Sequence, residues 1–355
     1  MRLGPLTSDG RRTLVAERKT TSEDLSIGSV YWKRLLLDVQ VSTYVAAGRD
    51  LGIPITGVFY DVLRKPMQYP GQVPLADEQG VKIVLDGAGQ RVRTKNDKKW
   101  RETGDAELGY TLQTRPETPS EYEARVLEAI SEDPERYYQR KHLVRLEDEL
   151  GEAELDAWQT ASMIRDARRL NVFPKNPDGC FVFYRECDYM PICSRLSSTD
   201  DPMMYRVSPK RHEELDTVTT DNGFELLTQS EVRAYRRCPR YHQLRYEKRL
   251  RRLGDPADPL RDGSLTHGAL EVWSKTRRDL SAALAYLERC VDPYVRAKIR
   301  AMVIGYHVMW EHEPIEWHYV EREYRLPLVN PETGAASRTF LRAGKLDGVV
   351  VGDFS

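Results

Sequence analysis

The stretch TLVAERKT (residues 13–20) decides the fold, together with AGKLDGVVV (343–351) far along the chain. Both are short apolar runs of the kind that form strands. Glu17 and Lys19 are two positions apart, so on a strand their side chains point to the same face. Asp347 lies beside a glycine, which allows close approach of backbone or ligand. Two carboxylates and one ammonium group at converging strand ends suit phosphodiester hydrolysis, because carboxylates bind Mg²⁺ or Mn²⁺.

Length and composition are those of a soluble globular protein. The chain has 355 residues, of which 40% are hydrophobic and 31% charged, so one large domain or two ordinary ones are possible. No run approaches the roughly 18 apolar residues that a membrane helix needs. The first residues contain no apolar segment typical of a secretion signal. We therefore expect a cytoplasmic protein that has no membrane partner.

Basic charge is concentrated in one segment, although the net charge is only −1. Residues 231–252 contain nine Lys or Arg against two Glu, with three tyrosines among them. Such a run can follow a phosphate backbone and stack on single-stranded bases. It is equally typical of a solvated helix face with buried tyrosines. The candidate DNA contacts are Arg236, Arg237, Arg240 and Tyr241.

An E-x-K pattern alone most often marks a pair of surface charges, but its surroundings here are specific. A helical stretch (32–48) follows it and carries Gln40 and Tyr44, which share one helix face at i, i+4 spacing. This arrangement resembles the RecB-type nucleases of the PD-(D/E)XK superfamily, in which a Q-x-x-x-Y helix follows the catalytic strand. The segments LTQSEVRAYRRCPRYHQLRY (227–246) and DGSLTHGALE (262–271) resemble the opening helix and the G-x-x-x-H motif of that family.

The resemblance implies an α/β (mixed α+β) fold of the restriction-endonuclease type, with a central mixed sheet flanked by helices. It also implies a metal-dependent deoxyribonuclease that uses Mg²⁺ or Mn²⁺. The implied metal ligands are His267, Asp347, Glu17 and the backbone carbonyl of Arg18. The implied catalytic residues are Asp347, Glu17, Lys19, Gln40 and Tyr44.

The motifs stand in a different order from that of the family. In the family, the cysteine helix, His motif and Asp strand precede the E-x-K strand, whereas here they follow it. We therefore expect residues 1–196 to form the usual C-terminal half, 197–227 a linker and 228–355 the usual N-terminal half of one nuclease domain. A circular permutation explains this order, since exposed loops tolerate new termini. A domain-swapped dimer and an arbitrarily cut reading frame explain it as well, and the oligomeric state stays open.

Cysteines provide a second resemblance. Cys180, Cys187 and Cys193 are closely spaced, and Cys238 stands apart in RRCPRY. One cysteine plus a group of three resembles the iron–sulfur nucleases related to RecB, in which four thiolates hold a [4Fe–4S] cluster. Zinc is the alternative, but structural zinc sites usually show C-x₂₋₄-C pairs, which are absent here. Cys290 has no place in this pattern and is expected to be an ordinary buried residue.

Together these patterns predict a DNA exonuclease that acts at free or single-stranded ends. A catalytically silent DNA-binding module and a structure-specific endonuclease are the alternatives. Partners by analogy are DNA and a helicase or another recombination or repair protein, but no motif requires a helicase. The sequence does not determine cleavage polarity, strand preference or pathway.

Overall fold

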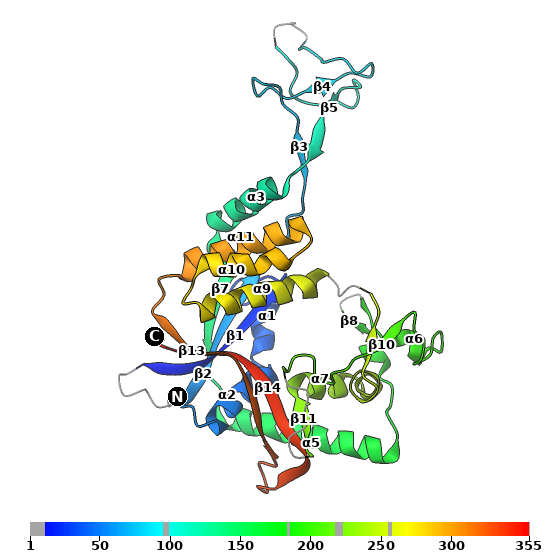
Figure 1. Cartoon of the computed structure of the whole chain (residues 1–355), viewed down its shortest axis with the longest axis vertical. Coiled ribbons are helices and arrows are strands. Elements are labelled where there is room, and N and C mark those ends of the chain that lie inside the picture. Colours follow the sequence, from blue (N-terminus) through cyan, green and yellow to red (C-terminus); the bar gives the residue numbers. More distant parts are fainter. Residues whose placement is uncertain (1–10, 95–98, 183–184, 217–222, 255–257, 355) are drawn as a thin grey trace. The chain divides into compact units, whose positions relative to one another are not determined.

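The computed structural model describes residues 11–94, 99–182, 185–216, 223–254 and 258–354 (Figure 1). The chain divides into two compact units, and each unit draws on both halves of the sequence. Unit 1 comprises Met1–Leu63, Gln139–Gly263 and His312–Ser355, and unit 2 comprises Arg64–Tyr138 and Ser264–Glu311.

Unit 1 is built on a mixed six-stranded sheet. Its strands follow the order β11-β14-β1-β2-β7, and β13 also pairs with β14. The pairs β1–β14 and β13–β14 are antiparallel, whereas β11–β14 is parallel. Figure 1 shows β1 in blue and β14 in red, the two ends of the colour scale, in one sheet. The strands are β1 (Arg12–Thr21), β2 (Ile55–Arg64), β7 (Tyr138–Leu143), β11 (Glu225–Thr228), β13 (Ile315–Val329) and β14 (Ala336–Gly352).

Both faces of strand β1 are covered, which explains its continuous apolar sequence. Successive side chains of a strand point to opposite faces. Val15 accordingly packs in a core cluster with helix α2, while Leu14 and Ala16 pack in a second cluster with Phe59 and Val350. Glu17 therefore lies on the face that α2 covers.

Helix α2 (Val39–Asp50) is the central helix of unit 1. The side chain of Asp38 caps it by accepting a hydrogen bond from the Gln40 backbone N–H. Its residues from Val41 to Gly48 are all buried, which fits a helix that packs on more than one side. At Gly48 a Cβ would lie 2.5 Å from Ile55 Cγ1, so glycine permits this close approach to β2.

Further helices and short elements complete unit 1. Among them, β10 pairs with β12, and β8 pairs with β9. The expected linker therefore contributes a strand to the unit. These elements are α1 (Val30–Leu35), α5 (Glu147–Leu170), η1 (Pro177–Gly179), β8 (Phe181–Val182), β9 (Arg185–Glu186), α6 (Met190–Cys193), β10 (Tyr205–Val207), α7 (Gln229–Arg237), α8 (Pro239–His242), the π-helical turn η2 (Gln243–Glu247) and β12 (Leu250–Arg252).

Unit 2 combines helices with a β-rich arm. In the arm, β3 pairs with β6 and β4 with β5. Tyr122, Val126 and Ile130 form the buried stripe of α3, whose N-terminus has a capping box. The elements are β3 (Gln72–Pro74), β4 (Val84–Leu85), β5 (Thr111–Leu112), β6 (Thr114–Pro116), α3 (Pro119–Glu132), α4 (Pro134–Tyr137), α10 (Leu280–Tyr286), η3 (Leu287–Arg289) and α11 (Pro293–Trp310), together with most of α9 (Asp258–Lys275).

Candidate active site

Glu17 and Asp347 lie on neighbouring strands, just beyond the last pair of the β1–β14 ladder, and their charges interact. The β1–β14 ladder pairs Val15 with Val349 and Ala16 with Gly348, so the next position brings the two carboxylates together. Residues directly opposite in an antiparallel pair project from the same face of the sheet. The Arg18 backbone N–H also donates a hydrogen bond to Asp347 Oδ2 at 2.8 Å. The acidic residues of the two sequence patterns therefore share one site.

The Glu17 carboxylate is almost completely buried, with 1% of the residue exposed. Its Oε1 accepts a hydrogen bond from Gln40 Nε2 at 3.1 Å and forms an ion pair with Lys19. Gln40 Nε2 also donates to the Tyr44 hydroxyl at 2.7 Å. Glu17 Oε2, in contrast, has no hydrogen-bond partner among the described residues. A buried carboxylate oxygen without a partner is costly unless a cation or a proton satisfies it.

The protonation of Glu17 reflects this environment. Burial raises the pKa of Glu17 to about 8, with Asp347 adding to the increase and Lys19 opposing it. Burial alone would lower the pKa of Lys19, but the carboxylates of Glu17 and Asp347 raise it. Lys19 therefore keeps its charge at neutral pH, and Glu17 requires a further positive charge to ionise fully.

The donor set fits a hard divalent cation. Mg²⁺ and Mn²⁺ prefer oxygen ligands, and this site offers the free Oε2 of Glu17 and the partly exposed carboxylate of Asp347. The backbone of Arg18 contacts Asp347 through its N–H. The carbonyl of the same residue is the further oxygen ligand that the resemblance implies. His267, in contrast, is a half-buried residue of α9 in unit 2. Its assignment as a ligand stays a prediction.

A glycine and an aromatic ring shape the strand beside Asp347. A Cβ on Gly348 would lie 2.5 Å from the Trp317 ring, so only glycine lets this tryptophan pack against β14. The Arg18 guanidinium lies 4.2 Å from the centroid of the same ring and forms an ion pair with Asp61 at 3.4 Å. The Arg18 side chain is thus held on the face opposite to Glu17, since the two residues are neighbours on one strand.

The four cysteines of the predicted cluster all lie in unit 1. The Asn176 backbone N–H donates to Cys238 Sγ at 3.3 Å, and Cys180 Sγ lies 3.8 Å from the Asn176 carbonyl. The Cys187 N–H binds the Cys180 carbonyl at 2.7 Å. Burial raises the pKa of Cys193, and Cys238 and Cys180 add to the increase. Within the described ranges, however, no three cysteine sulfurs lie within 4.8 Å of one another.

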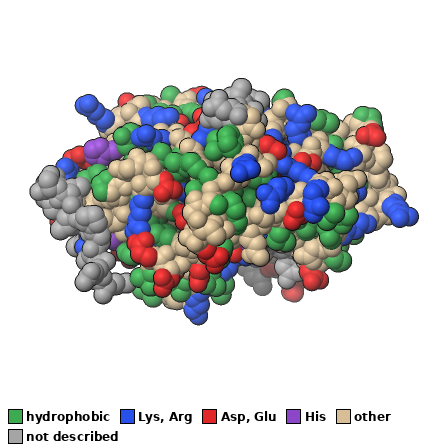
Figure 2. All heavy atoms as spheres, turned by 90° about the horizontal axis from the view of Figure 1, so that it is seen from below, with side chains coloured by type: hydrophobic (Ala, Val, Ile, Leu, Met, Phe, Trp, Pro, Cys, Tyr) green, Lys and Arg blue, Asp and Glu red, His purple; other side chains and the backbone are tan. Residues whose placement is uncertain are grey.

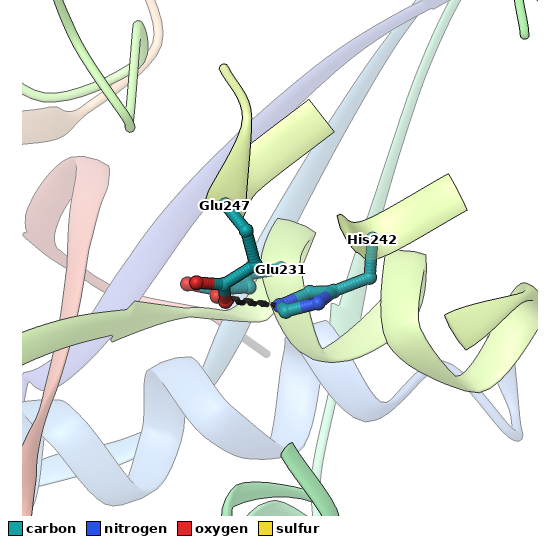
Figure 3. Close-up of side chains that lie close together, drawn as sticks. All are labelled: Glu231, His242 and Glu247. Atoms are coloured by element: carbon teal, nitrogen blue, oxygen red, sulfur yellow. Dashed lines mark hydrogen bonds and ion pairs between the residues drawn. The ribbon is translucent and has the colours of Figure 1, made fainter. Parts of the chain in front are cut away.

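A buried polar cluster that the sequence analysis missed lies beside helix α7. Figure 3 shows Glu231, His242 and Glu247 with their ligand atoms directed toward one another, all within 4.8 Å. His242 Nε2 and Glu231 Oε1 are 2.7 Å apart, and both residues are fully buried. Arg211, from the expected linker, forms ion pairs with Glu231 and with Glu247.

The charge balance of this cluster indicates a structural role. Burial alone would raise the pKa of Glu231, but the hydrogen bond from His242 and the charge of Arg211 lower it to about 2. Arg211 thus supplies the positive charge that a metal ion would otherwise provide. The sequence offered no motif for this cluster. The partners of Glu231, which are His242, Glu247 and Arg211, lie 11, 16 and 20 positions away from it.

The basic segment 231–252 is more buried than its composition suggests. Tyr235 and Tyr246 are buried, and Tyr241 packs edge-on against Tyr189 with ring centroids 5.2 Å apart. Arg240 binds the side chain of Gln243, and Arg237 donates to the Gly179 carbonyl at 2.6 Å. These contacts direct most of the segment inward. The aromatic rings therefore form part of the packing in this region.

Arg236 is the exposed member of the predicted DNA contacts. Half of its side chain is accessible, and it forms an ion pair with Asp156 at 2.6 Å. Figure 2 shows Lys and Arg side chains gathered mainly on the right of the view, the side on which α6 and α7 lie in Figure 1. Acidic side chains are interspersed among them. On this face of the molecule, basic side chains are thus more frequent on that side.

Comparison with known families finds one match, over about a third of the chain. The family model of the PD-(D/E)XK nuclease superfamily matches residues 226–339, which run from β11 into the start of β14. No curated protein and no solved structure matches the chain. The matched region includes His267 and Cys238 and ends before Asp347. With the mixed sheet and its flanking helices, this match confirms the predicted restriction-endonuclease-like fold class and indicates a metal-dependent nuclease. Among the described helices, none has the length and apolarity required to span a membrane.

Proposed function

We propose that this chain is a RecB-like, metal-dependent DNA exonuclease that hydrolyses phosphodiester bonds at free or single-stranded ends. One observation carries the proposal: Glu17 and Asp347, from strands more than three hundred residues apart in sequence, project from the same face of the sheet. Lys19 and Gln40 contact Glu17 at the same place.

Each side chain has a distinct task in this proposal. Glu17 and Asp347 hold Mg²⁺ or Mn²⁺, with the Arg18 carbonyl and His267 as further ligands. When bound, such an ion lowers the pKa of a coordinated water and neutralises charge on the phosphate. Lys19 keeps its proton and stabilises the negative charge that develops during attack. Gln40 orients the Glu17 carboxylate, and Tyr44 orients Gln40.

A circularly permuted nuclease domain accounts for the order of the motifs. The E-x-K strand β1 precedes the Asp strand β14 in the chain, yet the two are antiparallel neighbours. The family match falls on the later part of the chain, where the usual N-terminal half of the domain is expected. The pairing of β1 with β14 is the one that a circular permutation requires.

We further propose that Cys180, Cys187, Cys193 and Cys238 hold a [4Fe–4S] cluster. Asn176 contacts both Cys238 and Cys180, so the lone cysteine and the first of the group of three lie beside the same residue. Structural zinc sites usually show C-x₂₋₄-C pairs, which this sequence lacks, so we prefer an iron–sulfur cluster to zinc. Such a cluster would join the α7–α8 junction to the 180–193 segment. A colourless protein that contains zinc would contradict this assignment.

Cleavage of defined DNA substrates tests the proposed activity. The purified chain is incubated with end-labelled single strands, blunt duplexes or closed circles, in Mg²⁺, Mn²⁺ or EDTA. We expect cleavage of the linear substrates with either ion, and loss of cleavage in Asp347→Asn and Lys19→Ala. Folded protein that cuts none of the substrates would refute the proposal, and DNA binding without turnover would favour the silent module. Cleavage of closed circles would indicate an endonuclease.

A further inference from the structure

An open cleft lies in unit 1 between helix α7 and the turn that joins α1 to α2. Four arginines line it: Arg34 from α1, and Arg233, Arg236 and Arg237 from α7. Among the described residues, Asp38 is the one acidic residue in the lining, and the carboxylates that pair with Arg34 and Arg236, those of Glu23 and Asp156, lie outside it. The lining itself therefore carries more positive than negative charge. Its natural complement is a polyanion.

The arginines are available to a ligand. The side chains of Arg233, Arg236 and Arg34 are 64%, 50% and 47% exposed. Their present partners are acidic groups at or near the surface, and such exposed ion pairs contribute little to stability. A phosphate group can therefore displace these partners at small cost. Arg–phosphate contacts are charge-assisted and often bidentate.

The opposite wall of the cleft is apolar and exposed. Leu37, at the turn between α1 and α2, is 86% exposed and lines the cleft beside Val39. Its neighbours Leu36, Val30 and Ile27 are 63%, 65% and 96% exposed. Single exposed apolar residues are common, but a concentration of them on one short segment marks an interaction site. Because this wall also carries Arg34, apolar and basic groups line the cleft together, which suits a ligand that has both apolar and anionic parts.

The cleft is connected to the candidate active site through the hydrogen bonds of Asp38 and Gln40. Asp38 and Val39 line it, and the Asp38 side chain accepts a hydrogen bond from the Gln40 backbone N–H at 2.8 Å. Gln40 in turn binds Glu17. A strand that lies in the cleft therefore passes beside Asp38, which contacts a residue that binds Glu17.

We propose that this cleft binds single-stranded DNA on its way to the Glu17–Asp347 site, with Arg34, Arg233 and Arg236 on phosphates and Leu37 against a base. The inference rests on the proposed nuclease function and specifies its substrate. Double-stranded DNA stacks its bases inside the helix, so Leu37 can reach a base face only in an unpaired strand. The leucine thus makes the cleft selective for single strands, while the arginines supply affinity.

Binding measured without turnover tests the cleft separately from catalysis. The full chain is titrated in EDTA against a fluorescent 12-nucleotide single strand, by anisotropy at several salt concentrations. Each phosphate contact contributes about 0.7 to the log–log salt slope for single strands. We therefore expect Arg233→Ala/Arg236→Ala to lower the slope by about 1.4 and to weaken binding. Arg34→Ala, on the other wall, should lower it by about 0.7.

Matched controls come from exposed residues elsewhere in unit 1. Arg169 is 70% exposed with one nearby carboxylate, and Leu196 is 84% exposed. Arg169→Ala and Leu196→Ala should bind DNA as the wild type does. Leu37→Ala should weaken binding of the natural strand but not of an abasic strand of equal length, since only the former offers a base.

The possible results separate this inference from the proposed activity. The α7 double variant and Arg34→Ala could both bind DNA with the affinity and salt slope of the wild type. If the wild type still cleaves DNA, that result would overturn the cleft assignment alone. Equal losses for Leu37→Ala on natural and abasic strands would overturn the base contact. Binding through the cleft by a wild-type chain that cuts no DNA would uphold the cleft and refute the proposed hydrolysis.

Discussion

Replacement of Glu17 by Gln should change how the stability of the chain depends on pH. The carboxylate is 1% exposed, and burial, as the largest cause, raises its pKa from 4.5 to about 8. A carboxyl group whose pKa is higher in the folded chain than in the unfolded chain stabilises the fold fully at a pH below its unfolded pKa. This stabilisation is lost as the pH rises through the folded pKa. Ionisation of Glu17 thus destabilises the metal-free chain. Gln has a similar shape and does not titrate.

The magnitude follows from the displacement of the pKa. At about 1.36 kcal/mol per pH unit, the change from 4.5 to about 8 corresponds to about 5 kcal/mol in total. About 2 kcal/mol of this is already lost at pH 6, so about 3 kcal/mol remains to be lost between pH 6 and pH 9. Over that interval, Glu17→Gln should gain about 3 kcal/mol relative to the wild type.

Urea unfolding in EDTA at pH 6 and pH 9 measures this difference. Glu147→Gln is the matched control, because Glu147 is 79% exposed and its removal should leave the pH dependence unchanged. Parallel pH dependence in Glu17→Gln and the wild type would refute the reasoning, since Glu17 would then titrate as a solvated carboxylate. At saturating Mn²⁺, about one hundred times Kd, the wild type should gain about 2.7 kcal/mol and Glu17→Gln much less.

Three further predictions concern other parts of unit 1. Glu231→Gln should lose about 3 kcal/mol of stability at pH 7, because the pKa of Glu231 is lowered to about 2. This loss should vanish as the pH falls from about 4.5 to 2. Unfolding curves that show the same loss at pH 2 and at pH 7 would contradict the prediction. Gln40→Ala should weaken Mn²⁺ binding by about 10- to 100-fold in calorimetry without unfolding the chain, as expected for a group that orients a metal ligand; unaltered affinity would remove Gln40 from the site. Cys193→Ser should abolish the brown colour and lower the iron content of anaerobically purified protein, whereas Cys290→Ser should leave both unchanged; equal iron in the two variants would exclude Cys193 as a ligand.

The local motifs could be predicted because each depends on a short stretch of chain. The same-face placement of Glu17 and Lys19 follows from strand geometry, and the i, i+4 spacing of Gln40 and Tyr44 follows from helix geometry. The pairing of β1 with β14 needed more than geometry, since no local signal joins residues so distant. Resemblance to a family supplied it, and the ladder from Arg12 to Ala16 shows it.

The buried network around Glu231 could not be predicted for a physical reason. Its positive charge comes from Arg211, in a polar segment without periodicity. A buried carboxylate needs a partner from somewhere in space, but the sequence does not indicate which arginine will supply it. For the same reason, the tyrosines of 231–252 could be assigned neither to stacking nor to packing. The structure places two of them in the interior.

The position of a bound Mn²⁺ ion tests the central claim most directly. Crystals grown with MnCl₂ and measured near the manganese absorption edge locate the ion by its anomalous signal. The nuclease proposal predicts a peak about 2.1 Å from carboxylate oxygens of both Glu17 and Asp347. A peak only at the Glu231–His242–Glu247 cluster, or no peak at a concentration that supports cleavage, would contradict it.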